Sequence, residues 1–186
     1  DLHLNGYINE GSRLELNLNT RKVFSDKLST AVLLHKKYMN HGQDRNDDGF
    51  LDMPLENDFV AINRWKWFND KGWEGQFGFK ASILDHKGGS HEHFEGDSPD
   101  HENHWRFTQK LNRFEAWSKV GVVFPKNPTK SLGFQFSGVV QDSDSEFGFQ
   151  RYNSLQKSLY GNMIYQNVIN DGHSYKTGLS YQYDDI

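Results

Sequence analysis

The chain has 186 residues, enough for one domain, and a formal net charge of −4 from 21 Lys and Arg against 25 Asp and Glu. Because the basic residues form no stripe, the sequence lacks the electrostatic footprint of a nucleic-acid-binding protein. The absence of cysteine excludes a disulfide framework and thiolate metal sites, and no apolar run approaches the roughly 20 residues of a membrane helix.

Hydrophobic residues are few, but aromatic residues are abundant. Hydrophobic residues make up 35% of the chain, its mean hydropathy is −0.84, and aromatic residues reach 15%. A soluble sandwich of this length would bury more aliphatic surface, and a disordered chain would contain fewer aromatic residues. The composition therefore favours a sheet with a thin apolar face and a wet polar face.

Segments in which apolar and polar residues alternate follow one another along the chain. A period of two predicts strands rather than helices. The segment Phe59 to Phe68 is less regular, since both parities carry apolar residues. In chain order, the apolar series run over Leu14–Leu18, Leu28–Leu34, Trp73–Ile83, Phe114–Val122, Leu132–Val140, Leu159–Tyr165 and Tyr175–Tyr183.

The connections between these segments alternate between short and long. Short links are expected at Arg21 to Lys27, Asn69 to Gly72, Phe124 to Lys130 and Ile169 to Ser174. Long polar loops are expected at Met39 to Asn57, Asp85 to His104 and Gln141 to Tyr152. Short turns on one side and long loops on the other are typical of an outer-membrane β-barrel.

The sequence therefore predicts an all-β, antiparallel transmembrane β-barrel section with about eight strands in one domain over residues 1–186. In this count the first strand starts from the long-loop side and the last strand returns to it, so both ends of the chain lie on that side. Because open sheet edges are not tolerated in lipid, we expect further strands to close a larger barrel. The polar residues expected to face its interior are Glu15, Asn17, Glu74, Gln76 and Lys80.

The segment Asp44 to Asp52 resembles the front of a calcium-binding loop. Oxygen-bearing side chains alternate along it, and Gly49 at the sixth position permits the sharp turn that lets them converge. Leu55 stands where a bidentate Glu is expected, and a solvated acidic turn is the alternative. The ligands predicted for Ca²⁺ are Asp44, Asn46, Asp48, the backbone carbonyl of Phe50, and Asp52.

The second polar loop is rich in histidine and acidic residues. Imidazole favours zinc, copper, nickel and iron, so this loop is a candidate for the capture of a metal or a ligand. No closed tetrahedral spacing is evident, and a solvated hydrophilic loop is the alternative. Its histidines are His86, His91, His93, His101 and His104.

No motif of a hydrolase, a phosphate-binding loop or a zinc protease occurs, so catalysis is not predicted. Several runs resemble the barrel of TonB-dependent outer-membrane receptors of the Bacteroidetes type. The most particular are DRNDDGFLDMPL and NRWKW, and the others include RLELNLN, GWEGQFGFKA, NRFEAWSKVGVVFP and SLGFQFSGVVQD. The resemblance covers most of the chain.

The resemblance implies a barrel of about 22 strands that is closed by an N-terminal plug, in the bacterial outer membrane. It implies uptake of a metal chelate or cofactor of the siderophore, haem or cobalamin class, driven by the TonB complex through an N-terminal region missing here. The resemblance also allows a surface lipoprotein as a further partner. Calcium in the outer loops of such receptors agrees with the calcium loop predicted at Asp44. The alternatives are a porin-like channel and a soluble calcium-dependent adhesion or carbohydrate-binding β-domain.

Overall fold

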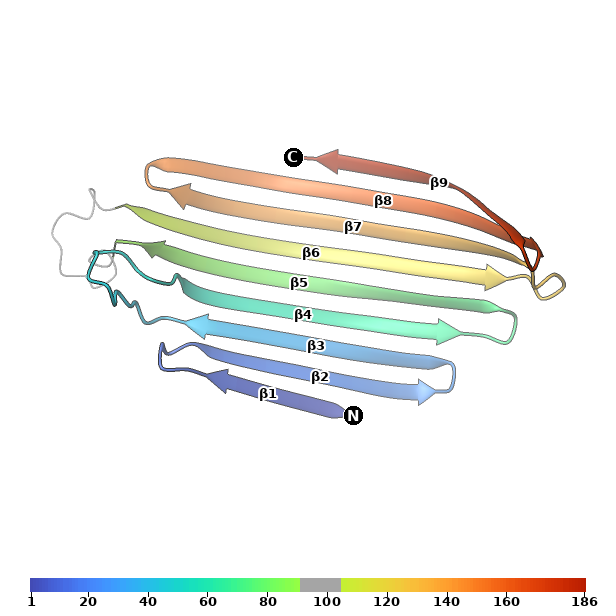
Figure 1. Cartoon of the computed structure of the whole chain (residues 1–186), viewed down its shortest axis with the longest axis horizontal. Coiled ribbons are helices and arrows are strands. Elements are labelled where there is room, and N and C mark those ends of the chain that lie inside the picture. The colour runs from blue at the N-terminus through green and yellow to red at the C-terminus, as the bar shows by residue number, and fades with distance from the viewer. Residues whose placement is uncertain (91–104) are drawn as a thin grey trace.

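The computed structural model describes residues 1–90 and 105–186. Each strand of its single antiparallel sheet pairs with its neighbours in the sequence (Figure 1). The nine strands are β1 Leu2–Ile8, β2 Leu14–Ser25, β3 Leu28–Met39, β4 Leu55–Phe68, β5 Trp73–Gly89, β6 Arg106–Val123, β7 Lys130–Phe147, β8 Gln150–Asn170 and β9 His173–Asp185. Over the described ranges, β1 and β9 do not pair with each other, so the sheet is open. No helix within them could cross a membrane.

The prediction of an all-β antiparallel sheet is confirmed, but the sheet has nine strands where the sequence indicated about eight. The additional strand is β1, which pairs with β2 through Leu4 opposite Leu18 and Ile8 opposite Leu14. Gly6 interrupts its apolar series, which conceals the period of two. β1 starts part-way along the sheet, opposite Thr20, and runs toward the long-loop end (Figure 1). Because β1 therefore enters from the short-turn side, the expectation that both ends lie on the long-loop side is wrong.

The loop expected at Gln141 to Tyr152 does not form. Strands β7 and β8 continue through this segment and meet at a two-residue turn, where Gly148 adopts a positive φ of 58°. Asp144 lies opposite Asn153, and an ion pair of 3.0 Å joins it to Arg151. Most residues of the segment are polar, and polarity alone suggested a loop.

Cross-strand register divides the sheet into two faces of opposite character. We call the side that carries Phe77, Phe134 and Leu179 the apolar face, and the side that carries Asn17 and Gln76 the polar face. One row of the apolar face contains Leu4, Leu18, Leu34, Ala61, Ala81, Phe114 and Val140. The adjacent row of the polar face contains Asn5, Asn17, His35, Val60, Ser82, Arg113 and Gln141. The residues expected to face a barrel interior, Glu15, Asn17, Glu74, Gln76 and Lys80, all lie on the polar face.

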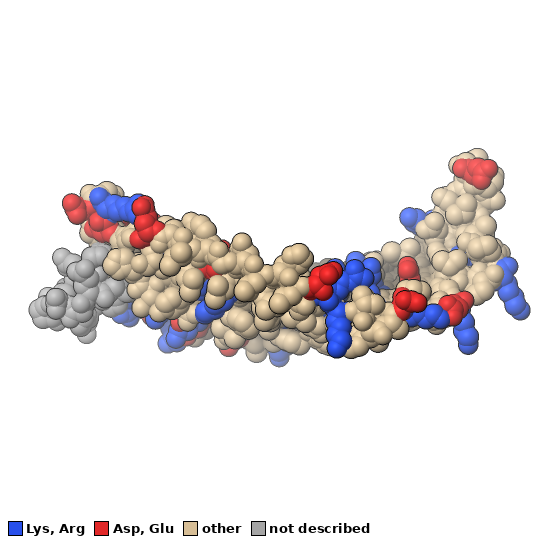
Figure 2. All heavy atoms as spheres, turned by 90° about the horizontal axis from the view of Figure 1, so that it is seen from below, with Lys and Arg blue, Asp and Glu red and all other residues tan. Residues whose placement is uncertain are grey.

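The sheet is a single layer, and its apolar face has no cover within the described residues. Phe136 is 56% exposed and Leu179 is 73% exposed. Among the described residues, the buried hydrophobic side chains are Met39 and Val122. In Figure 2 the body is thin and elongated along the strands, and uncharged residues form most of the visible surface.

Candidate functional site

The apolar face forms a belt of limited height along the central strands. Its stretches are 11, 9 and 9 residues long, about the 9 to 11 residues with which a tilted strand crosses a bilayer. The ten steps between eleven residues, at about 3.4 Å each and a tilt of about 40°, give a height of about 26 Å, close to the apolar band of known barrels. The stretches are Trp73–Ile83 on β5, Phe114–Val122 on β6 and Leu132–Val140 on β7.

Toward the long-loop end, the belt stops within one row of residues on three neighbouring strands. On the same face, Ile83 is followed by Asp85 and Lys87, Phe114 is preceded by Asn112 and Lys110, and Val140 is followed by Asp142 and Asp144. On these three strands, this face of the sheet is therefore polar beyond the boundary.

Ion pairs link the strands in this polar extension. Arg106 Nη2 lies 2.8 Å from Glu146 Oε1, and Arg151 Nη2 lies 3.0 Å from Asp144 Oδ2. The hydrogen bond and the charge of Asp144 raise the pKa of Arg151 above its usual value. Exposed pairs of this kind stabilise little by themselves.

Aromatic rings line the belt across several strands. Trp65 stacks between Phe24 and Phe77, with ring centroids 5.6 and 6.2 Å apart. The series continues through Phe79 to Phe114, at 6.1 and 6.3 Å. The Trp65 indole donates to Asn63 Oδ1 at 2.6 Å, so its polar N–H has a partner on the apolar face. Aromatic side chains of this kind suit the boundary between lipid and water.

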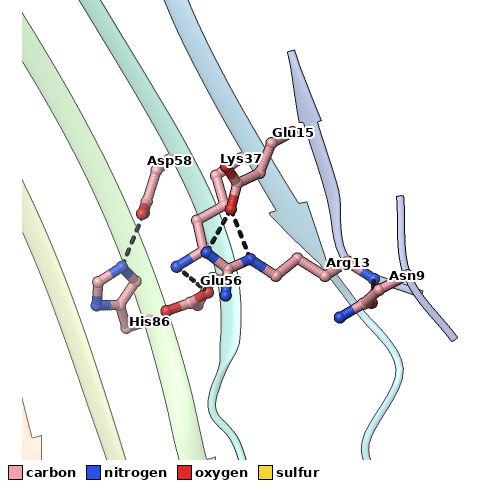
Figure 3. Close-up of polar contacts among 7 residues, drawn as sticks. All are labelled: Asn9, Arg13, Glu15, Lys37, Glu56, Asp58 and His86. Atoms are coloured by element: carbon pink, nitrogen blue, oxygen red, sulfur yellow. Dashed lines mark hydrogen bonds and ion pairs between the residues drawn. The ribbon is translucent and has the colours of Figure 1, made fainter. Parts of the chain in front are cut away.

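The long-loop end of the polar face carries a network of charged side chains (Figure 3). His86 Nε2 lies 2.8 Å from Asp58 Oδ1, and Lys37 Nζ lies 2.5 Å from Glu56 Oε2. Asp58 is buried, with 8% of its surface exposed. These pairs join β3, β4 and β5, so they hold side chains of three strands together on the polar face.

A third pair lies beside these two, at the start of β2. Arg13 forms an ion pair with Glu15, and the Arg13 backbone N–H donates to Asn9 Oδ1 at 3.1 Å (Figure 3). Arg13 Nε also donates to Glu15 Oε1 at 2.6 Å. The cations of this end of the polar face thus have acidic partners.

Of the five histidines proposed for a capture loop, the structure places His86 on strand β5, which extends to Gly89. Its partner there is Asp58. His91, His93, His101 and His104 lie outside the described residues. Metal or ligand capture by these histidines stays a prediction.

The carboxylates of the predicted calcium loop accept hydrogen bonds from their own loop. Asp44 accepts from the backbone N–H groups of Asp48 and Gly49, at 3.2 and 2.8 Å. Asp48 accepts from Asn46 Nδ2 and from the Phe50 backbone N–H, both at 2.9 Å. The left-handed φ of 82° at Gly49 provides the sharp turn that the sequence predicted.

The same loop is attached to the sheet at its far end. Asp52 Oδ2 accepts from the Arg45 backbone N–H at 3.0 Å, and the Leu51 N–H donates to Gly89 O at 2.9 Å. Within residues 1–90 and 105–186, no three His, Asp or Glu side chains converge as a metal site. Calcium binding by the loop stays a prediction.

Comparison of the chain with protein-family models, with curated proteins and with solved structures gives no significant match. Function must therefore be inferred from the residues and from the two faces of the sheet. Three features are available to a function: the belt, the polar extension beyond it, and the charged pairs on the polar face.

Proposed function

We propose that this sheet is part of the wall of a bacterial outer-membrane β-barrel, with the apolar face in contact with lipid. The observation that carries the proposal is the limited height of the belt, whose long-loop boundary falls within one cross-strand row on β5, β6 and β7. A side chain such as Phe136, 56% exposed at the middle of its stretch, would then be covered by hydrocarbon rather than by water.

The polar face would line the interior of the barrel. Glu15, Asn17, Glu74, Gln76 and Lys80 share this face and would contact water in the lumen. Strands β1 and β9 present unpaired backbone groups at the open edges of the sheet. Since such groups are too costly in hydrocarbon, the proposal requires further strands that close the wall into a larger barrel.

Within this class of protein, we propose a TonB-dependent receptor that transports a metal chelate or cofactor. The support is the resemblance carried by DRNDDGFLDMPL, NRWKW and the neighbouring runs. The polar extension and the Asp44 loop would then lie on the outer side and contribute to capture of the ligand. The TonB complex would act through a plug, and a porin-like channel is the main alternative.

A cysteine scan tests the membrane part of the proposal. Because the chain has no cysteine, spin labels can be attached singly along β7 from Leu132 to Val140 in the intact protein. We expect labels at even-numbered positions to be accessible to oxygen in the bilayer, and labels at odd-numbered positions to a water-soluble nickel chelate. Accessibility to the nickel chelate at every position would disprove the lipid contact and favour a soluble β-domain.

An uptake assay separates the receptor from the porin. Cells that carry the intact protein are given labelled ferric siderophore, haem or cobalamin, with and without an uncoupler of the inner-membrane proton gradient. A TonB-dependent receptor loses accumulation when the gradient collapses, whereas a porin continues to pass its solute. If the labelled solute still enters the cells in the presence of the uncoupler, the receptor proposal is wrong and the porin-like channel is favoured.

A further inference from the structure

The cations of the polar face differ in their partners between the two ends of the sheet. At the long-loop end, Lys37 pairs with Glu56. In the middle of the sheet, Lys80 lies 3.1 Å from Glu115, and Arg113 Nε lies 2.9 Å from the same carboxylate. These cations are therefore neutralised by neighbours on the same wall.

Toward the short-turn end of β2, β4 and β6, four cations of the same face make no ion pair and no side-chain hydrogen bond with the part of the chain that the structure describes. They are exposed, and they come from strands that are far apart in the sequence. The four are Arg21 on β2, Arg64 and Lys66 on β4, and Lys119 on β6.

Cross-strand register brings these four cations into two adjacent rows. Lys66 and Lys119 both lie opposite Gln76, and Arg21 and Arg64 both lie opposite Ala31. The backbones of Lys66 and Lys119 are two strands apart, a separation of about 10 Å. Arg64 and Lys66 are two residues apart along β4, a separation of about 7 Å. These separations are close to the Debye length of about 8 Å at physiological salt, so the charges reinforce one another's potential.

This part of the polar face is also hollowed. A cavity of about 590 Å³ is lined by Arg21, Lys66, Glu74, Gln76, Lys119 and Gln135, among others. Its volume lies in the range of small-molecule sites, about 300–1,000 Å³. Glu74 and Asp26 are the acids among its lining residues, against Arg21, Lys27, Lys66 and Lys119.

One of these cations is already paired, and two others are partly offset by a nearby acid. Lys27 forms an ion pair with Asp70 in the neighbouring turn. Glu74 is diagonal to both Lys66 and Lys119 and partly offsets them, but it lies within 4 Å of neither amine. With Arg64 beside the rim, the hollow keeps a net positive charge that the described residues do not neutralise.

We propose that this hollow is an anion-binding site for a small solute with two or more phosphate or carboxylate groups. Such a ligand would place one oxyanion near Lys66 and Lys119 and another near Arg64 and Arg21. Arginine offers a planar fork that fits either group with two hydrogen bonds, and lysine adds a compact charge. Gln76, between the lysines, supplies an amide donor on the same wall. The site lies on the face opposite the belt and does not depend on contact with lipid.

Calorimetric titration of the intact protein with inorganic pyrophosphate, in a neutral detergent and about 50 mM NaCl, tests the site. We expect saturable binding that weakens as the salt is raised. In the double variant Lys66→Gln/Lys119→Gln, the Kd should rise by about tenfold or more. The conservative variant Lys119→Arg should keep the Kd within about threefold.

The matched control is Lys126→Gln, which removes the same charge from the exposed turn between β6 and β7. Its Kd should equal that of the unmodified protein. If the double variant loses its β-sheet circular dichroism, the single variant Lys119→Gln decides, since that side chain is exposed and unpaired among the described residues. The proposal is overturned if the double variant, or Lys119→Gln where the double variant does not fold, binds pyrophosphate with the same Kd as Lys126→Gln.

An octaglutamate peptide serves as the second probe. Binding of the peptide without binding of pyrophosphate would mean that an acidic polypeptide segment occupies the hollow, and the small-solute proposal would be wrong. Absence of heat with pyrophosphate at millimolar concentration would also reject it. The two proposals can fail separately. If every spin label on β7 were accessible to the nickel chelate while pyrophosphate still bound, the membrane proposal would be wrong and the anion site would stand.

Discussion

Leu179 and Ser180 offer a direct test of which solvent covers each face of the sheet. They are adjacent residues of β9, lie on opposite faces and are both exposed, Leu179 at 73%. Leu179 is at the middle of the apolar series from Tyr175 to Tyr183. Replacing each in turn by Arg therefore introduces the same charge at the same level, once toward the proposed lipid and once toward the proposed lumen.

The two substitutions should differ strongly in cost. An Arg on the lipid face near the bilayer midplane costs about 2–4 kcal/mol. Full burial of a leucine is worth about 1.5–3 kcal/mol, so covering the 73% that is exposed contributes about 1–2 kcal/mol, which Leu179→Arg also loses. The sum is about 3–6 kcal/mol, or roughly 10² to 10⁴ in the folding equilibrium. Ser180→Arg should stay within about 0.5 kcal/mol, as exposed polar sites do.

The assay is urea-dependent folding of the intact protein into phosphatidylcholine vesicles, followed by tryptophan fluorescence. We expect a large loss of folding free energy for Leu179→Arg and almost none for Ser180→Arg. In a soluble protein with a solvated sheet, both substitutions would be nearly neutral. Equal effects of the two variants would refute the assignment of lipid to the apolar face.

Three further outcomes are expected. A Cβ atom on Gly78 would lie 2.4 Å from the Trp117 ring, so Gly78→Val should destabilise folding by about 1–3 kcal/mol in the same urea assay; unchanged stability would contradict this contact. Calorimetric titration with millimolar Ca²⁺ should give binding that Asp44→Asn weakens, and no heat in the unmodified protein would reject the calcium loop. Titration with Zn²⁺ should lose affinity when His91 and His93 are both replaced by Ala, and an unchanged affinity would remove these histidines as ligands.

The two faces of the sheet could be predicted from the sequence because the period of two is a local property. Each residue of Gly72 to Asp85 shows its parity without reference to any other strand. Antiparallel pairing then keeps side chains of one parity together, so Glu74, Gln76 and Lys80 lie on the polar face as expected.

Two strand boundaries could not be predicted, for different physical reasons. In β1 the Gly6 position has no side chain to signal its face, so the apolar series looked too short for a strand. In β7 and β8, polar residues around Asp144 and Arg151 occupy both faces, since neither face there contacts the belt. A strand without an apolar face has no alternation to detect, although its backbone pairing is unchanged.

The basic hollow could not be predicted either, because it depends on register between strands. Lys66 and Lys119 are 53 residues apart and meet only because β5 places Gln76 between them. Arg64 and Lys66 lie in a segment whose parity was ambiguous, since Val60, Ile62 and Phe68 share their face. The face on which a residue lies can be predicted from its own strand. A charged cluster that extends across five strands can be predicted only when the register of all five is known.

Because residues 1–90 and 105–186 form no hydrophobic core of their own, the apolar face requires a cover. Ordering each residue costs about 1–2 kcal/mol of conformational entropy, and two buried hydrophobic side chains among the described residues cannot offset that. The cover is therefore either a second protein layer or lipid. A protein layer does not require polar residues to replace apolar ones on one face within a single row of each other on β5, β6 and β7, whereas a bilayer surface favours such a boundary. The position of Asp85, Lys110 and Asp142 is thus the reason to expect that Leu179→Arg will be costly while Ser180→Arg will not.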